Sequence, residues 1–249
     1  MLPYIHIGQF SLGTFGLMMW VAFVAAFILL DRDFRRHNIK VDPQVAVALC
    51  ALAGIIGAKL YHVWDTPGEP FLSRTGFAWF GGFLGGLGTL VLIALYYKVP
   101  LLRFLDACSP AAALGYAVGR IGCLVSGDGD YGIPTSLPWG MSFPNGLVPT
   151  TQRVHPTPIY EFLAGIFITW ALWRLGTRVI AGGMRFGTVL AAFLVFSGLE
   201  RFLVEFIRIN PRVVWGMSNA QVASLASVAS GCVLFFFLRR GPHYSKVTA

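Results

Sequence analysis

Charged side chains are scarce in this chain of 249 residues, where Asp, Glu, Lys and Arg together make up only 12%. Soluble domains carry about 25% charged residues, so the composition excludes an ordinary soluble protein. Hydrophobic residues reach 56%, and the mean hydropathy is +0.68. We therefore predict an integral membrane protein.

Acidic residues are the scarcer of the two signs, with 11 Asp and Glu against 19 Lys and Arg and a net charge of +8. Such a balance can indicate nucleic-acid binding. Here the basic residues lie in short loops between apolar segments rather than on one amphipathic face. We therefore expect a membrane environment and no nucleic-acid partner.

Cysteine is also rare, and no two cysteines form a Cys-x-x-Cys pair. This pattern argues against a zinc site and against disulfides, and we expect neither a metal nor a cofactor. The N-terminal stretch "MLPYIHIGQF" lacks the basic region of a signal peptide. We expect the first apolar segment to remain as a membrane helix.

Seven segments are apolar enough to cross a bilayer, which takes about 20 residues. They lie at about 11–30, 44–63, 77–98, 104–125, 158–175, 186–206 and 217–238. These segments predict an all-α polytopic fold with seven transmembrane helices. We find no internal repeat and no second soluble domain, so residues 1–249 form a single predicted membrane domain.

Lys and Arg are distributed unevenly between the two sets of loops. Twelve lie in one set, which includes the C-terminus, and four lie in the other, at Arg74, Arg153, Arg208 and Arg212. Cytoplasmic loops carry the excess of positive charge. We therefore predict an outside N-terminus, a cytoplasmic C-terminus and an outer-face position for the long loop at about 126–157.

Arg120 lies near the outer end of the fourth apolar segment, in "GRIGCLVSGDGDYG". A long arginine there can snorkel to the headgroups, or its planar fork can bind a phosphate. Gly119 and Gly122 would leave room for such a ligand. Asp128 and Asp130 follow, and Gly-Asp-Gly favours a tight turn. We expect the turn role more for Asp130 and a functional carboxylate more for Asp128.

The sixth segment ends in "LERFLVEFIRINPR", where Arg201, Glu205 and Arg208 are spaced i, i+4, i+7. This spacing places all three on one helical face. The face is either a structural ladder of ion pairs or, together with Arg120, an anion pocket near the outer leaflet.

Two weaker signals lie elsewhere in the chain. In "VHPTPIYEF", two prolines start a helix, His155 lies just before it, and the helix dipole accounts for Glu161 in the first turn. Lys59 and His62 are three residues apart and can share one side of the second segment. That side is either an interior polar face or the product of snorkelling.

These stretches, in this order on seven apolar segments, resemble the prolipoprotein diacylglyceryl transferase family. The resemblance rests on "GAKLYHV", on "GRIG" followed by glycine and an acid, on "HPTPIYE" and on "RFLVEFIR". It implies an enzyme of the bacterial cytoplasmic membrane with its site toward the outer leaflet. The family enzyme moves a diacylglyceryl group from phosphatidylglycerol to the lipobox cysteine thiol in a prolipoprotein signal peptide and releases glycerol phosphate.

The resemblance also implies roles for individual residues. Arg120 would hold the lipid phosphate, and Arg201 would stabilise charge there or activate the thiol. Asp128 takes the place of the signature glutamate as the third catalytic residue. The other expected substrate-binding residues are Glu205, Arg208, His155, Tyr160, Lys59 and His62.

The sequence departs from the family pattern at four polar positions. Cys123 and Ser126 stand where asparagines are usual, Phe80 where histidine is common, and Ser197 where tyrosine is usual. Three alternatives therefore remain: a transferase with another acceptor, a transporter of an anionic lipid or solute, and a non-catalytic lipid-binding protein. Cys123 itself is either a nucleophile or a small packing residue.

Overall fold

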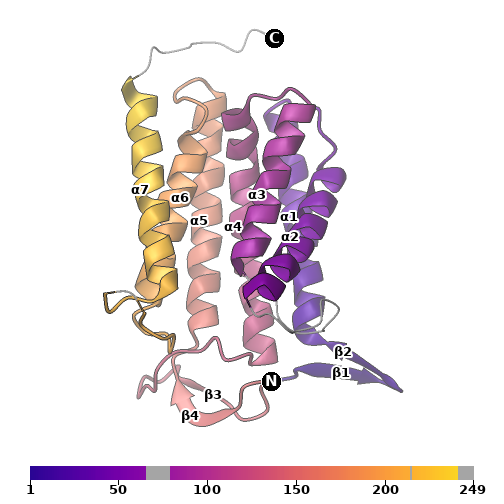
Figure 1. Cartoon of the computed structure of the whole chain (residues 1–249), viewed down its shortest axis with the longest axis vertical. Helices are drawn as coiled ribbons and strands as arrows, with labels where there is room; N and C mark the ends of the chain where they lie inside the picture. Colours follow the sequence, from indigo (N-terminus) through magenta and orange to yellow (C-terminus); the bar gives the residue numbers. More distant parts are fainter. Residues whose placement is uncertain (66–78, 214, 241–249) are drawn as a thin grey trace.

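The computed structural model describes residues 1–65, 79–213 and 215–240, and Figure 1 shows a bundle of roughly parallel helix axes. In chain order the elements are β1 (Tyr4–Ile7), β2 (Phe10–Gly13), α1 (Thr14–Arg36), α2 (Pro43–Asp65), α3 (Trp79–Tyr96), α4 (Leu101–Ser126), β3 (Met141–Phe143), β4 (Thr150–Val154), α5 (Thr157–Ile180), α6 (Thr188–Val204) and α7 (Asn219–Arg240).

Each predicted apolar segment coincides with one of the seven helices in the described residues. Five of them, α1, α2, α4, α5 and α7, are long and apolar enough to cross a membrane. The apolar part of α3, Gly81–Tyr96, is shorter, and α6 has 17 residues. Large apolar side chains such as Trp20, Leu92 and Phe237 are exposed, as expected for helices that face lipid. The protein is therefore a multi-pass membrane protein.

The all-α prediction is incomplete, because two antiparallel hairpins, β1–β2 and β3–β4, accompany the helices. Both lie at the same end of the bundle as the N-terminus, whereas α7 ends at the opposite end (Figure 1). The first apolar segment was expected to enter its helix at residue 11, but residues 10–13 pair with residues 4–7. The backbone N–H and the hydroxyl of Thr14 both donate to the carbonyl of Pro3, so α1 begins only there.

Glycines allow α2 and α3 to pack backbone against backbone. A Cβ atom at Gly81 would lie 2.1 Å from the carbonyl oxygen of Gly57, and one at Gly85 would lie 2.3 Å from that of Ala53. Real Cβ atoms do not approach so closely. Small residues promote such close helix contacts in membranes, so the glycine-rich start of α3 has a structural role in this pairing.

The body of the bundle is built around α4. Phe104 of α4 packs against Phe34 of α1 with ring centroids 5.4 Å apart. Asp106 of α4 is buried and accepts hydrogen bonds of 2.7 Å from the backbone N–H groups of Gly187 and Leu190 at the start of α6. This carboxylate satisfies N–H groups that have no partner within their own helix. It therefore fixes α6 against α4.

The long loop between α4 and α5 is tied to the chain segment that follows α6. Gly127 ends α4 with φ of +60°, a conformation that glycine adopts readily. Gly132 donates to the carbonyl of His155, and Ile133 donates to that of Ile207, both at 2.8 Å. These bonds bring Asp130 and Arg208 to the same place.

Candidate functional site

Three arginine side chains converge on one buried glutamate, Glu161, which was expected in the first turn of its helix but lies at the start of the second turn, because α5 begins at Thr157. Oε1 of Glu161 lies 3.3 Å from Nε of Arg120 and 3.1 Å from Nη1 of Arg201, and its Oε2 lies 3.2 Å from Nη1 of Arg208. Arg120 comes from the last two turns of α4, Arg201 from the last turn of α6, and Arg208 from just beyond it. Buried charges are tolerated when they are paired, and Glu161 is fully buried.

Two more carboxylates complete the cluster. Asp130 pairs with Arg120, with 2.5 Å between Oδ2 and Nη1, and its other oxygen pairs with Arg208. Glu205 lies 3.0 Å from Nη2 of Arg201 and also faces Arg208. Three guanidinium groups therefore face three carboxyl groups. They come from the end of α4, the start of α5, the end of α6 and the adjoining loops. Figure 1 shows these helix ends at the same end of the bundle as the N-terminus and both hairpins.

A tyrosine that the sequence reading passed over extends the cluster inward. The hydroxyl of Tyr116 donates to Oε1 of Glu161 at 2.7 Å and accepts from Nη2 of Arg120 at 2.9 Å. The guanidinium carbon of Arg120 also lies 4.6 Å from the centre of the tyrosine ring. Arg120 is therefore directed into the protein by a carboxylate, a hydroxyl and a ring face, and the snorkelling interpretation is wrong.

The three arginines differ in how open they are to a ligand. The side-chain exposure is 23% for Arg201, 15% for Arg120 and 6% for Arg208. Arg201 and Arg120 can thus meet a phosphate while they keep their carboxylate partners, and Arg208 is mainly enclosed. The predicted single helical face is wrong in one respect, because α6 ends at Val204 and Arg208 reaches the cluster from the following turn.

The two aspartates of the Gly-Asp-Gly turn exchange the roles that the sequence suggested. Oδ1 of Asp128 accepts a 3.2 Å hydrogen bond from the backbone N–H of Asp130, which is turn chemistry. Asp130 carries the ion pairs. Burial and the neighbouring Asp130 raise the pKa of Asp128. Although burial opposes the effect, Arg208 and Arg120 lower the pKa of Asp130.

The remaining predicted residues lie at the edge of the cluster or outside it. His155 and Tyr160 are neighbours, with 3.2 Å between Nδ1 and the hydroxyl oxygen, and the indole N–H of Trp139 donates to the same hydroxyl at 2.7 Å. Tyr160 directly precedes Glu161 in α5. The ion pairs described for the three arginines involve neither Lys59 nor His62 of α2.

Cys123, Asp128 and Asp130 are the one group of possible metal ligands found among the described residues, with donor atoms within 4.8 Å of one another. Both oxygens of Asp130 already pair with guanidinium groups, and Sγ of Cys123 lies 3.8 Å from Nη1 of Arg120. A cation would compete with two arginines there. The group therefore fits a metal poorly, and its role is in the arginine network.

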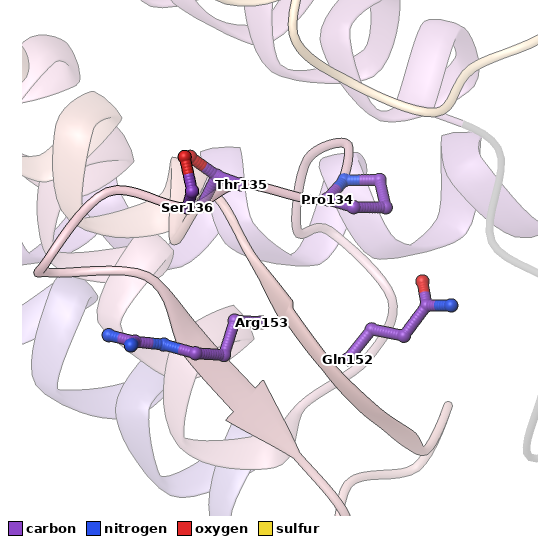
Figure 2. Close-up of a pocket in the computed structure, with 5 residues that line it drawn as sticks. All are labelled: Pro134, Thr135, Ser136, Gln152 and Arg153. Carbon is purple, nitrogen blue, oxygen red and sulfur yellow. The ribbon is translucent and has the colours of Figure 1, made fainter.

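A shallow hollow of about 470 Å³ lies on the long loop, away from the cluster. Figure 2 shows the loop on one side of it and strand β4 on the other. The side chain of Arg153 points away from Gln152 (Figure 2) and donates to three backbone carbonyl groups between residues 137 and 140. These hydrogen bonds stabilise the conformation of the loop. No residue of the arginine cluster lines the hollow. The lining residues are Pro134, Thr135, Ser136, Gln152 and Arg153.

The sequence also matches a known protein family. The sequence profile of the prolipoprotein diacylglyceryl transferase family matches residues 3–237. The chain belongs to this family. The match includes every member of the arginine cluster, so the cluster lies within the part of the chain that defines the prolipoprotein diacylglyceryl transferases.

Three bacterial relatives are each named phosphatidylglycerol–prolipoprotein diacylglyceryl transferase. The protein of Methylobacillus flagellatus is 31% identical over 259 residues, covering 95% of this chain and 96% of its own length. That of Clostridium tetani is 30% identical over 235 residues, covering 89% and 91%. That of Leptospira interrogans is 29% identical over 235 residues, covering 80% and 72%. This prolipoprotein diacylglyceryl transferase family member therefore matches these relatives over most of its length.

Two of the residues that depart from the family pattern, Ser126 and Ser197, have hydroxyl groups that form hydrogen bonds within their own helices. The hydroxyl of Ser126 donates to the carbonyl of Gly122, and that of Ser197 donates to the carbonyl of Phe193, each within its own helix. Neither hydroxyl adds a group to the cluster. The side chain at position 80 lies outside the described residues.

Proposed function

We propose that the protein transfers the diacylglyceryl group of phosphatidylglycerol to the lipobox cysteine thiol in the signal peptide of a prolipoprotein. Family membership supports the reaction, and the convergence of Arg120, Arg201 and Arg208 at one end of the bundle supports the site. A thioether forms between the thiol sulfur and the glycerol carbon. The bond between that carbon and the phosphate oxygen breaks, and glycerol phosphate leaves.

We further propose that all seven helices cross the bacterial cytoplasmic membrane, with the N-terminus outside and the C-terminus in the cytoplasm. The excess of Lys and Arg in the loops at the far end supports this orientation. The N-terminus, both hairpins and the helix ends that carry the cluster share one end (Figure 1). In this orientation the arginines meet lipid headgroups of the outer leaflet.

The arginines act on the charge that develops as the ester bond breaks. Arg201 and Arg120, the more exposed pair, would hold the phosphate, because a guanidinium fork matches phosphate oxygens. Glu161 and Glu205 hold these forks in place before substrate enters, so little reorganisation is needed in the transition state. Arg208 serves mainly to anchor Asp130 and Glu161.

The other predicted residues keep more limited proposed roles. His155 and Tyr160, beside the first turn of α5, are placed to meet the polar part of a headgroup. Lys59 and His62 remain predicted substrate contacts from α2. Asp128 remains a predicted catalytic residue, although its described hydrogen bond to the N–H of Asp130 is that of a turn.

The test combines the purified protein with labelled phosphatidylglycerol and a lipobox peptide. We expect a thioether product, and we expect Arg120→Ala and Arg201→Ala each to lower turnover about 100-fold or more, by analogy with the loss of one charge-stabilising donor. Arg35→Ala is the matched control, because Arg35 is 78% exposed and pairs with Asp31. Full activity in either cluster variant would refute the phosphate assignment.

The same assay distinguishes the alternatives. Glycerol phosphate released without peptide modification would indicate a different acceptor. Binding of phosphatidylglycerol with neither product would indicate a non-catalytic lipid-binding protein. Movement of labelled lipid between leaflets of a reconstituted vesicle would indicate a transporter, a class that often uses paired interrupted helices.

A further inference from the structure

Most carboxylates in or beside the arginine cluster are already engaged. Asp130 and Glu161 each pair with more than one arginine, and Glu205 pairs with two and accepts a 2.6 Å hydrogen bond from Asn210. Asp128 accepts the backbone hydrogen bond of its own turn. Such a carboxylate can take a proton only by weakening these interactions. Asp130, Glu161 and Glu205 are therefore poorly placed to act as a base, whereas Asp128 is held in its turn by one hydrogen bond.

Glu200 differs from these four acids. It lies in the last turn and a half of α6, and its Oε1 is buried with neither a hydrogen bond nor an ion pair. Oε2 of Glu205 also lacks a hydrogen bond, but it lies 3.0 Å from Nη2 of Arg201. Across the described part of the chain Glu200 forms no ion pair. A buried acceptor without a partner is unusual in a folded protein, so Oε1 of Glu200 calls for a functional explanation.

Glu200 also belongs to the same electrostatic environment as the cluster. Its charge interacts with that of Glu161 and with all three arginines, and it interacts with the hydroxyl of Tyr116 on α4. It directly precedes Arg201, the most exposed of the arginines. A group held by Arg201 would therefore lie in the electrostatic field of a carboxylate oxygen that has no hydrogen-bond partner.

The proposed reaction needs such a group. The nucleophile is a thiolate, and an ordinary cysteine with a pKa of about 8.5 is mostly protonated at neutral pH. A positioned base that removes the thiol proton during attack contributes about 10²- to 10⁴-fold in rate. The arginines supply charge stabilisation but cannot accept a proton.

We propose that Glu200 is the general base that accepts the proton of the acceptor thiol, an inference that rests on the proposed transferase function. The thiol proton moves to Oε1 of Glu200 as the sulfur attacks the glycerol carbon. The carbon–sulfur bond forms, the carbon–oxygen bond breaks, and the electron pair leaves on glycerol phosphate. Glu200 then returns the proton to the departing phosphate or to water, which restores the carboxylate.

The experiment compares two lipobox peptides, one with cysteine and one with selenocysteine at the acceptor position. A selenol is already ionised at neutral pH and needs no base. We expect Glu200→Gln to lower turnover with the cysteine peptide about 10²-fold or more and to shift the rise of rate with pH toward the pKa of the thiol itself, about 8.5. With the selenocysteine peptide the same variant should stay within about threefold of the wild type, because the remaining machinery is intact.

Two variants serve as controls. Glu200→Asp keeps a carboxylate and should recover part of the cysteine-dependent rate. Asp31→Asn removes a partly exposed carboxylate from the opposite end of the bundle and should behave as the wild type with both peptides. Thermal unfolding in detergent confirms that each variant folds, and Glu200→Asp carries the comparison should the glutamine variant be unstable.

The outcomes separate the possible explanations. Equal losses of Glu200→Gln on both peptides would reveal a structural role and overturn the inference. Full activity on the cysteine peptide would overturn it as well. A selective loss in Asp128→Asn, with Glu200→Gln unaffected, would assign the proton to Asp128 instead. A wild-type protein inactive on both peptides would refute the proposed function itself, and the role of Glu200 with it.

Discussion

Replacing Glu161 with glutamine is the sharpest test of how the arginine cluster is held together. The change preserves the size of the side chain and removes its charge. Arg120, Arg201 and Arg208 then lose a shared partner at 3.1–3.3 Å. The new amide would also present N–H donors toward guanidinium donors. Of the carboxylates that form ion pairs with these arginines, Asp130 and Glu205 would remain to balance three buried or half-buried positive charges.

The magnitude follows from the burial of the pair. Removing one partner of a buried ion pair costs about 3–5 kcal/mol, because the other charge stays buried and unpaired. Glu161 is fully buried, and the enclosed Arg208 is only 6% exposed, so we expect the variant to fall in this range. At about 1.4 kcal/mol per factor of ten, the unfolded fraction should rise roughly a hundred- to several-thousand-fold. We also expect turnover to fall, since the two phosphate-binding forks lose their alignment.

The assay is equilibrium unfolding in mixed micelles with increasing dodecyl sulfate, followed by the fluorescence of the 7 tryptophans. Asp31→Asn is the control, because it removes a partly exposed i,i+4 pair and such pairs contribute only about 0.3–0.5 kcal/mol. A loss in Glu161→Gln as small as that of the control would show that Glu161 is not the centre of the network.

Two further predictions concern the packing and the charge of the same fold. Gly85→Ala places a Cβ 2.3 Å from a carbonyl oxygen of α2 and should destabilise the protein by about 1–3 kcal/mol. Gly88→Ala meets nothing within 4 Å and should be neutral or stabilising, so equal thermal shifts would contradict the close packing. Burial would raise the pKa of Asp130, but Arg208 and Arg120 lower it in the folded protein. The ion pairs of Asp130 therefore stabilise the fold above the pKa of the unfolded chain, about 3.9. This stabilisation is lost as the pH falls through the lower pKa of the folded protein. Asp130→Asn should therefore lower the melting temperature at pH 7 and approach the wild type at pH 3, whereas a constant difference would refute the assignment.

The positions of the helices could be predicted from the sequence, because a lipid-facing segment must satisfy its backbone hydrogen bonds internally and therefore appears as one long apolar run. The β1–β2 hairpin could not be predicted from the sequence. Its strands of four residues, Tyr4–Ile7 and Phe10–Gly13, continue directly into the first apolar run. Composition does not distinguish them from a helix start, and the pairing depends on contacts made after folding.

The cluster was predictable in part, for a similar reason. Arg120 and Arg201 stand out because a charge within an apolar run is costly. Glu161 does not stand out, because the two prolines before it suggested a position in the first turn of a helix, where the helix dipole alone would explain an acid. Glu200 was also missed, since the i, i+4, i+7 pattern around Arg201 passes over it.

The order in which the partners of Arg120 are synthesised bears on how the protein is made. Asp130 follows Arg120 by only ten residues, whereas Glu161, Arg201 and Arg208 belong to later helices. When α4 and the turn that follows it leave the ribosome, they carry both the arginine and a carboxylate to neutralise it. The insertion machinery can thus pass a paired charge into the bilayer before α5 exists, and the network is completed as each later helix arrives.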